Sequence, residues 1–173
     1  MSLNINTQTI RRLRDALLES GRLDEQPGDI NNETKTDDRS QALMNRVSPF
    51  AETMYLTMMA DGVAAESEKE AIRGALQVLT QGFLDESMLE KILERCQRLA
   101  REQGVEFRLQ TLGAQLCADR QDRETAFTLA AAVAMADNQV VDEETSLVDS
   151  IAEWYGVSAK RCSEILQQIE NQS

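Results

Sequence analysis

Apolar residues recur every three or four positions along most of this chain, which predicts a series of helices that each bury one face. Ser48-Pro49 is a candidate interruption of the first long helix, because serine suits an N-cap and proline the first helical position. Capping residues and glycines indicate where each predicted helix begins and ends. The predicted helices cover about 41–60, 66–80, 86–103, 106–118, 122–136, 142–155 and 158–170.

The first 40 residues have a different pattern. Helical spacing from Thr7 to Leu23 predicts an N-terminal amphipathic helix, whereas Asp24 to Arg39 contains almost no apolar residues. A segment that has so little to bury is typical of a flexible linker. We therefore expect an N-terminal helix and acidic linker over 1–40, and one helical domain over 41–173.

Two of the predicted helices are apolar on more than one side. The run from Ala126 to Ala136 is apolar all round, and its counterpart from Met54 to Ala60 is largely so. Such helices belong at the centre of a bundle, where alanines allow the backbones to approach closely. We expect the two to pack against each other, with their methionines filling the core rather than binding a metal.

Composition agrees with an all-α fold and limits the class of function. Helix-forming residues dominate, and the net charge is −12, from 18 basic and 30 acidic side chains. A nucleic-acid-binding protein needs a basic face, and an anionic membrane surface would repel this chain. No apolar stretch is long enough to cross a membrane, and the segment from Met1 to Thr9 lacks the apolar core of a signal peptide. We expect a soluble protein without direct membrane insertion.

The residues available for chemistry are few. The chain has no histidine, which excludes histidine-based acid–base catalysis and most zinc and iron sites. Its three cysteines, Cys96, Cys117 and Cys162, are odd in number and far apart in amphipathic runs. This pattern predicts reduced thiols in the core and therefore a cytoplasmic location.

One short acidic motif occurs twice. Met-Ala-Asp ends an apolar helix, a glycine or asparagine follows, and a glutamate stands seven positions after the aspartate. The copies are offset by 76 residues, as from Asp61 to Asp137. The repeat predicts a compact bundle of about seven helices with an internal two-fold arrangement, plus the N-terminal helix. Its acidic residues are Asp61, Glu68, Asp137 and Glu144.

The motif has two interpretations. As a structural device, each aspartate would accept hydrogen bonds from turn amides or from the free N–H groups of the next helix. As a site, the two Asp/Glu pairs would face one another and hold a hard divalent cation such as Ca²⁺, Mg²⁺ or Mn²⁺, with no organic cofactor. An EF-hand is excluded, because the residues after Asp61 lack oxygen ligands at the third and fifth loop positions.

The repeated Ala-Asp-Gly/Asn motif with its later glutamate, in an acidic all-α domain, resembles the TerB family of tellurite resistance proteins and the related domain of DjlA-type co-chaperones. The resemblance covers about 41–170. It implies a compact helical bundle with a non-enzymatic role in bacterial stress or metal-stress response. It also implies a metal-binding cluster at Asp61, Glu68, Asp137 and Glu144. Asn138 in place of glycine, and Ala65 and Val141 in place of a small polar residue, depart from the family pattern.

Three functions follow from these observations. The first is a TerB-like module that binds a cation or a protein partner through its acidic cluster. The second is an interaction scaffold whose N-terminal helix is the docking element, with the acids serving only as helix caps. The third is a hydrolase that uses two carboxylates, which would need a deep cleft holding such a pair beside Trp154 or Tyr155.

Overall fold

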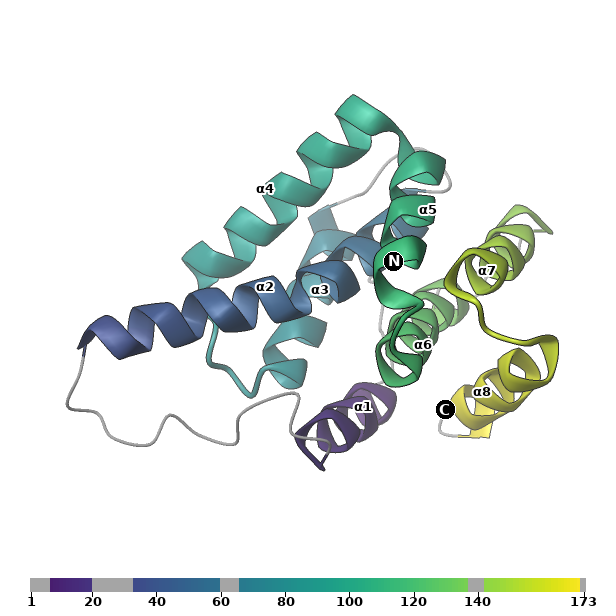
Figure 1. The fold of residues 1–173 in the computed structure, drawn as a ribbon, viewed down its shortest axis with the longest axis horizontal. Coiled ribbons are helices and arrows are strands. Elements are labelled where there is room, and N and C mark those ends of the chain that lie inside the picture. Colours follow the sequence, from purple (N-terminus) through teal and green to yellow (C-terminus); the bar gives the residue numbers. More distant parts are fainter. Residues whose placement is uncertain (1–6, 20–32, 60–65, 137–141, 172–173) are drawn as a thin grey trace.

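The computed structural model describes residues 7–19, 33–59, 66–136 and 142–171, with side chains left out at 33–40, 66–68, 135–136 and 142–146. Within these ranges the chain forms helices and no strand, as the all-α prediction requires (Figure 1). The helices are α1 (Thr7–Glu19), α2 (Glu33–Met58), α3 (Glu66–Leu79), α4 (Glu86–Gln103), α5 (Val105–Leu116), α6 (Arg120–Ala136), α7 (Asp142–Tyr155) and α8 (Ala159–Asn171).

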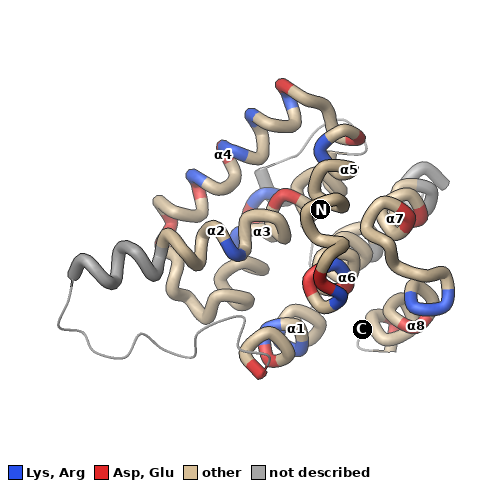
Figure 2. Tube along the Cα trace, viewed as in Figure 1, with Lys and Arg blue, Asp and Glu red and all other residues tan. Residues whose placement is uncertain are grey.

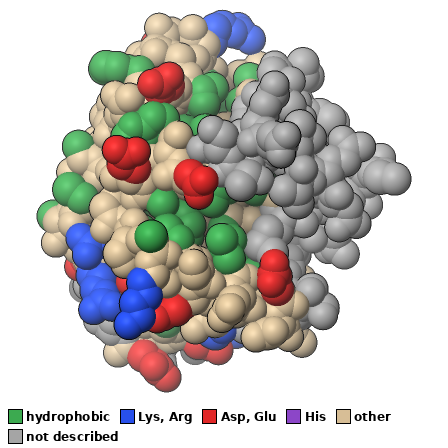
Figure 3. Space-filling model, turned by 90° about the vertical axis from the view of Figure 1, so that its right-hand side faces the viewer, with side chains coloured by type: hydrophobic (Ala, Val, Ile, Leu, Met, Phe, Trp, Pro, Cys, Tyr) green, Lys and Arg blue, Asp and Glu red, His purple; other side chains and the backbone are tan. Residues whose placement is uncertain are grey.

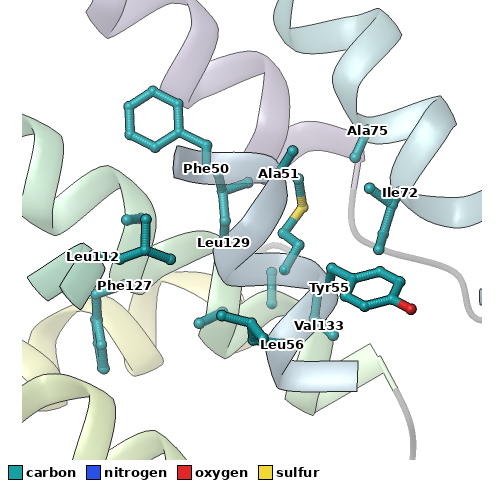
Figure 4. Packing of buried hydrophobic residues seen from close by; sticks show 14 of the residues in the cluster. Phe50, Ala51, Tyr55, Leu56, Ile72, Ala75, Leu112, Phe127, Leu129 and Val133 are labelled. Carbon is teal, nitrogen blue, oxygen red and sulfur yellow. The ribbon is translucent and has the colours of Figure 1, made fainter. Parts of the chain in front are cut away.

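The centre of the bundle is the contact between α2 and α6, the most extensive between any two described helices. Phe50 and Ala51 of α2 and Leu129 and Val133 of α6, which Figure 4 labels, are buried apolar residues of these two helices. α6 also carries buried alanines such as Ala126 and Ala130, and small side chains let helix backbones pack closely. The expectation that these two helices form the core together is confirmed.

Several helix ends follow the local signals in the sequence. Asp85 precedes α4, and its Oδ1 accepts from the amide of Met88 at 2.9 Å. Ser158 precedes α8, and its hydroxyl accepts from the amide of Arg161 at 3.2 Å. Gly156, with φ 74°, ends α7 in a left-handed conformation that glycine adopts without strain. The predicted ends of these helices are therefore confirmed.

α2 departs from the prediction in two ways. It starts at Glu33, inside the segment expected to be a linker, and it continues through Pro49 without interruption. Proline cannot donate to the carbonyl of Asn45, but Val47 and Phe50 on either side of it are fully buried, so tertiary packing holds the helix together. Ser48 is not an N-cap, because its hydroxyl donates to the carbonyl of Met44 at 2.6 Å.

α1 lies against the body of the bundle, mainly on α3, and the expected continuation of this helix to Leu23 lies outside the described residues. Its apolar side chains Ile10 and Leu17 are buried, and Arg12 donates to Oε1 of Gln168 on α8 at 3.2 Å. Figure 1 shows α1 beside the end of α8. The amphipathic face of α1 is therefore already used within the chain.

Among the described side chains, most charged residues lie on the outside of the helices, and Glu52, Arg108 and Asp122 are the buried exceptions. Figure 2 shows both signs alternating along α4, whose outer side faces solvent. Where the structure is described, no helix carries an apolar stretch long enough to span a bilayer.

Candidate functional site

The two copies of the acidic motif lie between helices that correspond to each other. The first connects α2 to α3, and the second connects α6 to α7. α3 and α7 are both 14 residues long, and they begin at Glu66 and Asp142, an offset of 76 residues. The helix after each motif copy therefore starts at the same point of the motif.

An ion pair joins α2 to the start of α6. Arg46 donates from Nη1 to Oδ2 of Asp122 at 3.0 Å and from Nη2 to Oδ1 at 2.7 Å. These residues are also 76 positions apart. Equivalent positions of two copies meet in this way where the copies pack about a two-fold axis. The ion pair thus supports a two-fold arrangement of the repeat, which stays a prediction.

From this ion pair the two central helices run in the same direction. Almost all of α6 lies after Asp122, and its residues 125–133 are buried. α2 is exposed at 41–42 and buried throughout 50–58, so the buried part of α6 must lie along that later part of α2. The ends of the two helices, and with them the starts of both motif copies, therefore lie at the same end of the pair.

The predicted ligands themselves lie outside the part of the chain whose side chains are described. Asp61 and Asp137 fall between the described segments, and Glu68 and Glu144 belong to the first turns of α3 and α7 without described side chains. Among the described side chains, no group of three or more acids or cysteines could hold a metal ion. On the face drawn in Figure 3, the coloured Asp and Glu side chains stand apart from one another.

A second polar site, which the sequence interpretation missed, lies in the interior. Glu52 of α2 and Arg108 of α5 are both buried, and Nε and Nη2 of Arg108 donate to the Glu52 carboxylate at 2.6 and 2.8 Å. Hydrogen bonding to Glu52 raises the pKa of Arg108, so the guanidinium is charged. A signal was present, since each residue replaces an apolar one in a buried helical stripe.

Beside this ion pair, Thr53 of α2 meets Tyr155 of α7. Thr53 Oγ1 donates to the carbonyl of Pro49 at 2.8 Å and lies 2.7 Å from the Tyr155 hydroxyl. Because the single hydroxyl proton of Thr53 is used by Pro49, Tyr155 must be the donor of the second bond. Burial raises the pKa of Tyr155, which keeps this hydroxyl protonated. We call Glu52, Thr53, Arg108 and Tyr155 the polar junction.

The cysteines differ in their surroundings. Cys96 of α4 is buried beside the polar junction, and burial raises its pKa to about 12, so its thiol stays protonated at neutral pH. Cys162 is partly buried, and burial raises its pKa as well. Cys117 is exposed, which corrects the expectation of a core thiol there. All three are free thiols in the described structure.

Residues 50–168, which form most of the chain, match the family model described as tellurite resistance protein TerB. The matched range includes both copies of the acidic motif, whereas α1 and residues 33–49 of α2 lie before it. No curated protein and no solved structure matches the chain.

Proposed function

Because this chain belongs to the TerB family of tellurite resistance proteins, we propose that it is a non-enzymatic, cytoplasmic helical module of bacterial tellurite or metal-stress response. The module would use a cluster of four carboxylates to bind either a divalent cation or a protein partner. These are Asp61, Glu68, Asp137 and Glu144.

The observation that carries this proposal is the common direction of α2 and α6. Helices that run side by side in one direction bring their C-terminal ends to the same end of the pair, which supports the proposal that the two motif copies act together. An aspartate at a helix C-terminus is opposed by the helix dipole, and a bound cation would offset that cost. Carboxylates without histidine or thiolate favour Ca²⁺, Mg²⁺ or Mn²⁺.

Cation binding can be tested by thermal unfolding of the full chain with each of these ions. A ligand that binds only the folded state stabilises it by about 2.7 kcal/mol at a hundredfold excess over Kd. The variant Asp61→Asn/Asp137→Asn should lose this ion-dependent gain. Glu94→Gln/Glu102→Gln, which removes two exposed acids from α4, is the matched control and should keep it.

The result also separates the two interpretations of the motif. If the aspartates only cap turns, Asp61→Asn/Asp137→Asn would unfold at a lower temperature with or without ions. No ion would then increase the difference between the melting temperatures of the wild-type protein and the variant. That outcome would rule out the cation site.

The alternatives draw less support from the described residues. A scaffold that docks through α1 would need an apolar face that α1 already buries within the chain. A carboxylate-pair hydrolase would need two acids in a cleft near Tyr155. The described acid beside that residue is Glu52, which is buried and bound by Arg108.

A further inference from the structure

A cavity of about 230 Å³ lies between α2, α4 and α5, on the side of α2 that carries Glu52. In Figure 1 α4 and α5 form two sides of a corner above α2. The buried residues of its wall are Glu52, Ile92, Cys96, Arg108 and Leu112, and polar side chains reach it from all three helices. The exposed polar residues that line the cavity include Asn45, Arg95 and Gln115.

Arg108 has hydrogen-bonding capacity left at this cavity. A guanidinium carries five N–H donors. Two of them bind Glu52, and Nη1 donates to Oε1 of Gln103 at 3.3 Å. The Glu52 contact uses the edge formed by Nε and Nη2, so one N–H group on Nη1 and one on Nη2 remain. These two N–H groups can donate to the oxygens of a carboxylate or phosphate.

The charges around the cavity favour an anion, although the protein as a whole is strongly acidic. The charge of Arg108 is balanced by Glu52, which leaves that of Arg95 in excess among the lining residues. The side chains of Asn45 and Gln115 add neutral donors. The cavity is smaller than the roughly 300–1,000 Å³ of sites for drug-sized ligands, which suits a small metabolite.

We propose that this cavity binds a small molecule through a carboxylate or phosphate group. The group accepts hydrogen bonds from the remaining N–H groups of Arg108 and pairs with Arg95. Glu52 holds the Arg108 guanidinium in place, and the remaining polar side chains contact the rest of the ligand. This site is separate from the acidic motif, so it does not depend on cation binding.

Titration calorimetry of the full chain with inorganic phosphate, and separately with acetate, tests the proposal. Each titration is compared with sodium chloride at the same ionic strength. Arg95→Gln changes an exposed residue and should leave the fold intact. It should weaken binding of the preferred anion by about tenfold or more, because a charge-assisted hydrogen bond is lost. Tighter binding of phosphate or of acetate identifies the group that the site takes.

Arg98→Gln is the matched control, since Arg98 lies exposed on the same helix, does not line the cavity and carries the same charge. The affinity of this variant should stay within about twofold of the wild-type value, because no hydrogen bond to the ligand is lost and salt weakens the effect of an exposed charge. If both substitutions weaken anion binding equally, the anion is attracted to exposed basic side chains in general, and the proposal is overturned. The absence of binding beyond that seen with sodium chloride would overturn it as well.

Discussion

α2 takes part in two kinds of packing, and they hold the bundle in different ways. One face meets α6 through an apolar seam, where α2 and α6 bring together buried residues such as Phe50, Leu129 and Val133 (Figure 4). Glu52 and Thr53 on another side belong to the polar junction with α5 and α7. Apolar burial is non-directional, so the seam stabilises through area and shape. The junction stabilises only while each polar group keeps its partner.

This difference has a consequence for substitutions. In the seam, the loss of one side chain costs the contacts and area of that side chain alone. In the junction, the loss of one side chain also leaves its partner buried without a hydrogen bond or a counter-charge. In the junction, replacing both partners by apolar residues should therefore cost less stability than removing one partner alone. In the seam, a second substitution should bring no such recovery.

The largest effect is expected for Arg108→Ala. It leaves the Glu52 carboxylate buried without its cation, and should lower the free energy of unfolding by about 3–5 kcal/mol. Chemical denaturation measures this. The double variant Glu52→Leu/Arg108→Met replaces the pair by apolar groups and should recover most of the loss. If the double variant is as unstable as the single one, an unpaired buried partner is not the source of the loss, and the proposed difference between junction and seam is contradicted.

Leu129→Ala is the corresponding change in the seam. Leu129 is fully buried, so its truncation should cost about 2–5 kcal/mol through lost burial and the cavity left behind. Leu129→Met, which nearly conserves volume, should cost less than about 1.5 kcal/mol in the same denaturation experiment. Equal costs for the two variants would contradict a packing origin.

Gly113→Ala tests how closely α5 and α7 approach at the edge of the junction. An added Cβ would overlap the carbonyl oxygen of Trp154 and lie 2.9 Å from its carbonyl carbon. The helices would have to shift, with a cost of about 1–3 kcal/mol. Gly74→Ala in α3 has open space around the new Cβ and should instead stabilise by about 0.5–1 kcal/mol. Thermal unfolding would show opposite signs for the two variants.

The smallest effects compare the two partners of one hydrogen bond. Thr53→Val leaves the buried Tyr155 hydroxyl without its acceptor and should cost about 1–3 kcal/mol. Tyr155→Phe removes the donor, but Thr53 keeps its bond to Pro49, so the cost should be about 0.5–1.5 kcal/mol. A larger loss for Tyr155→Phe than for Thr53→Val would contradict the assigned direction of the bond.

Much of the helical framework could be predicted from the sequence, because its signals are local. Asp85 and Ser158 accept from amides three residues later, and Gly156 ends α7 through its own backbone conformation. The apolar runs likewise identified α2 and α6 as the core pair. The acidic motif was found in the same way, since a repeat is visible without any structure.

The polar junction could not be predicted in this way. Glu52 and Arg108 each stand out as a charged residue in an apolar stripe, but they are 56 positions apart, and nothing local says that they meet. The same holds for Thr53 and Tyr155, which are 102 positions apart. The cavity beside them exists only where three helices come together.

The sequence by itself determined which segments form helices, where most of them end, and which acids repeat. Tertiary structure decided that α2 continues through Pro49, that α1 buries its apolar face on the bundle, and which polar residues pair in the interior. Helix ends depend on residues within one turn of each other, so the sequence carries them directly. Interior contacts depend on which distant helices pack together, and burial there can outweigh a local breaker such as Pro49.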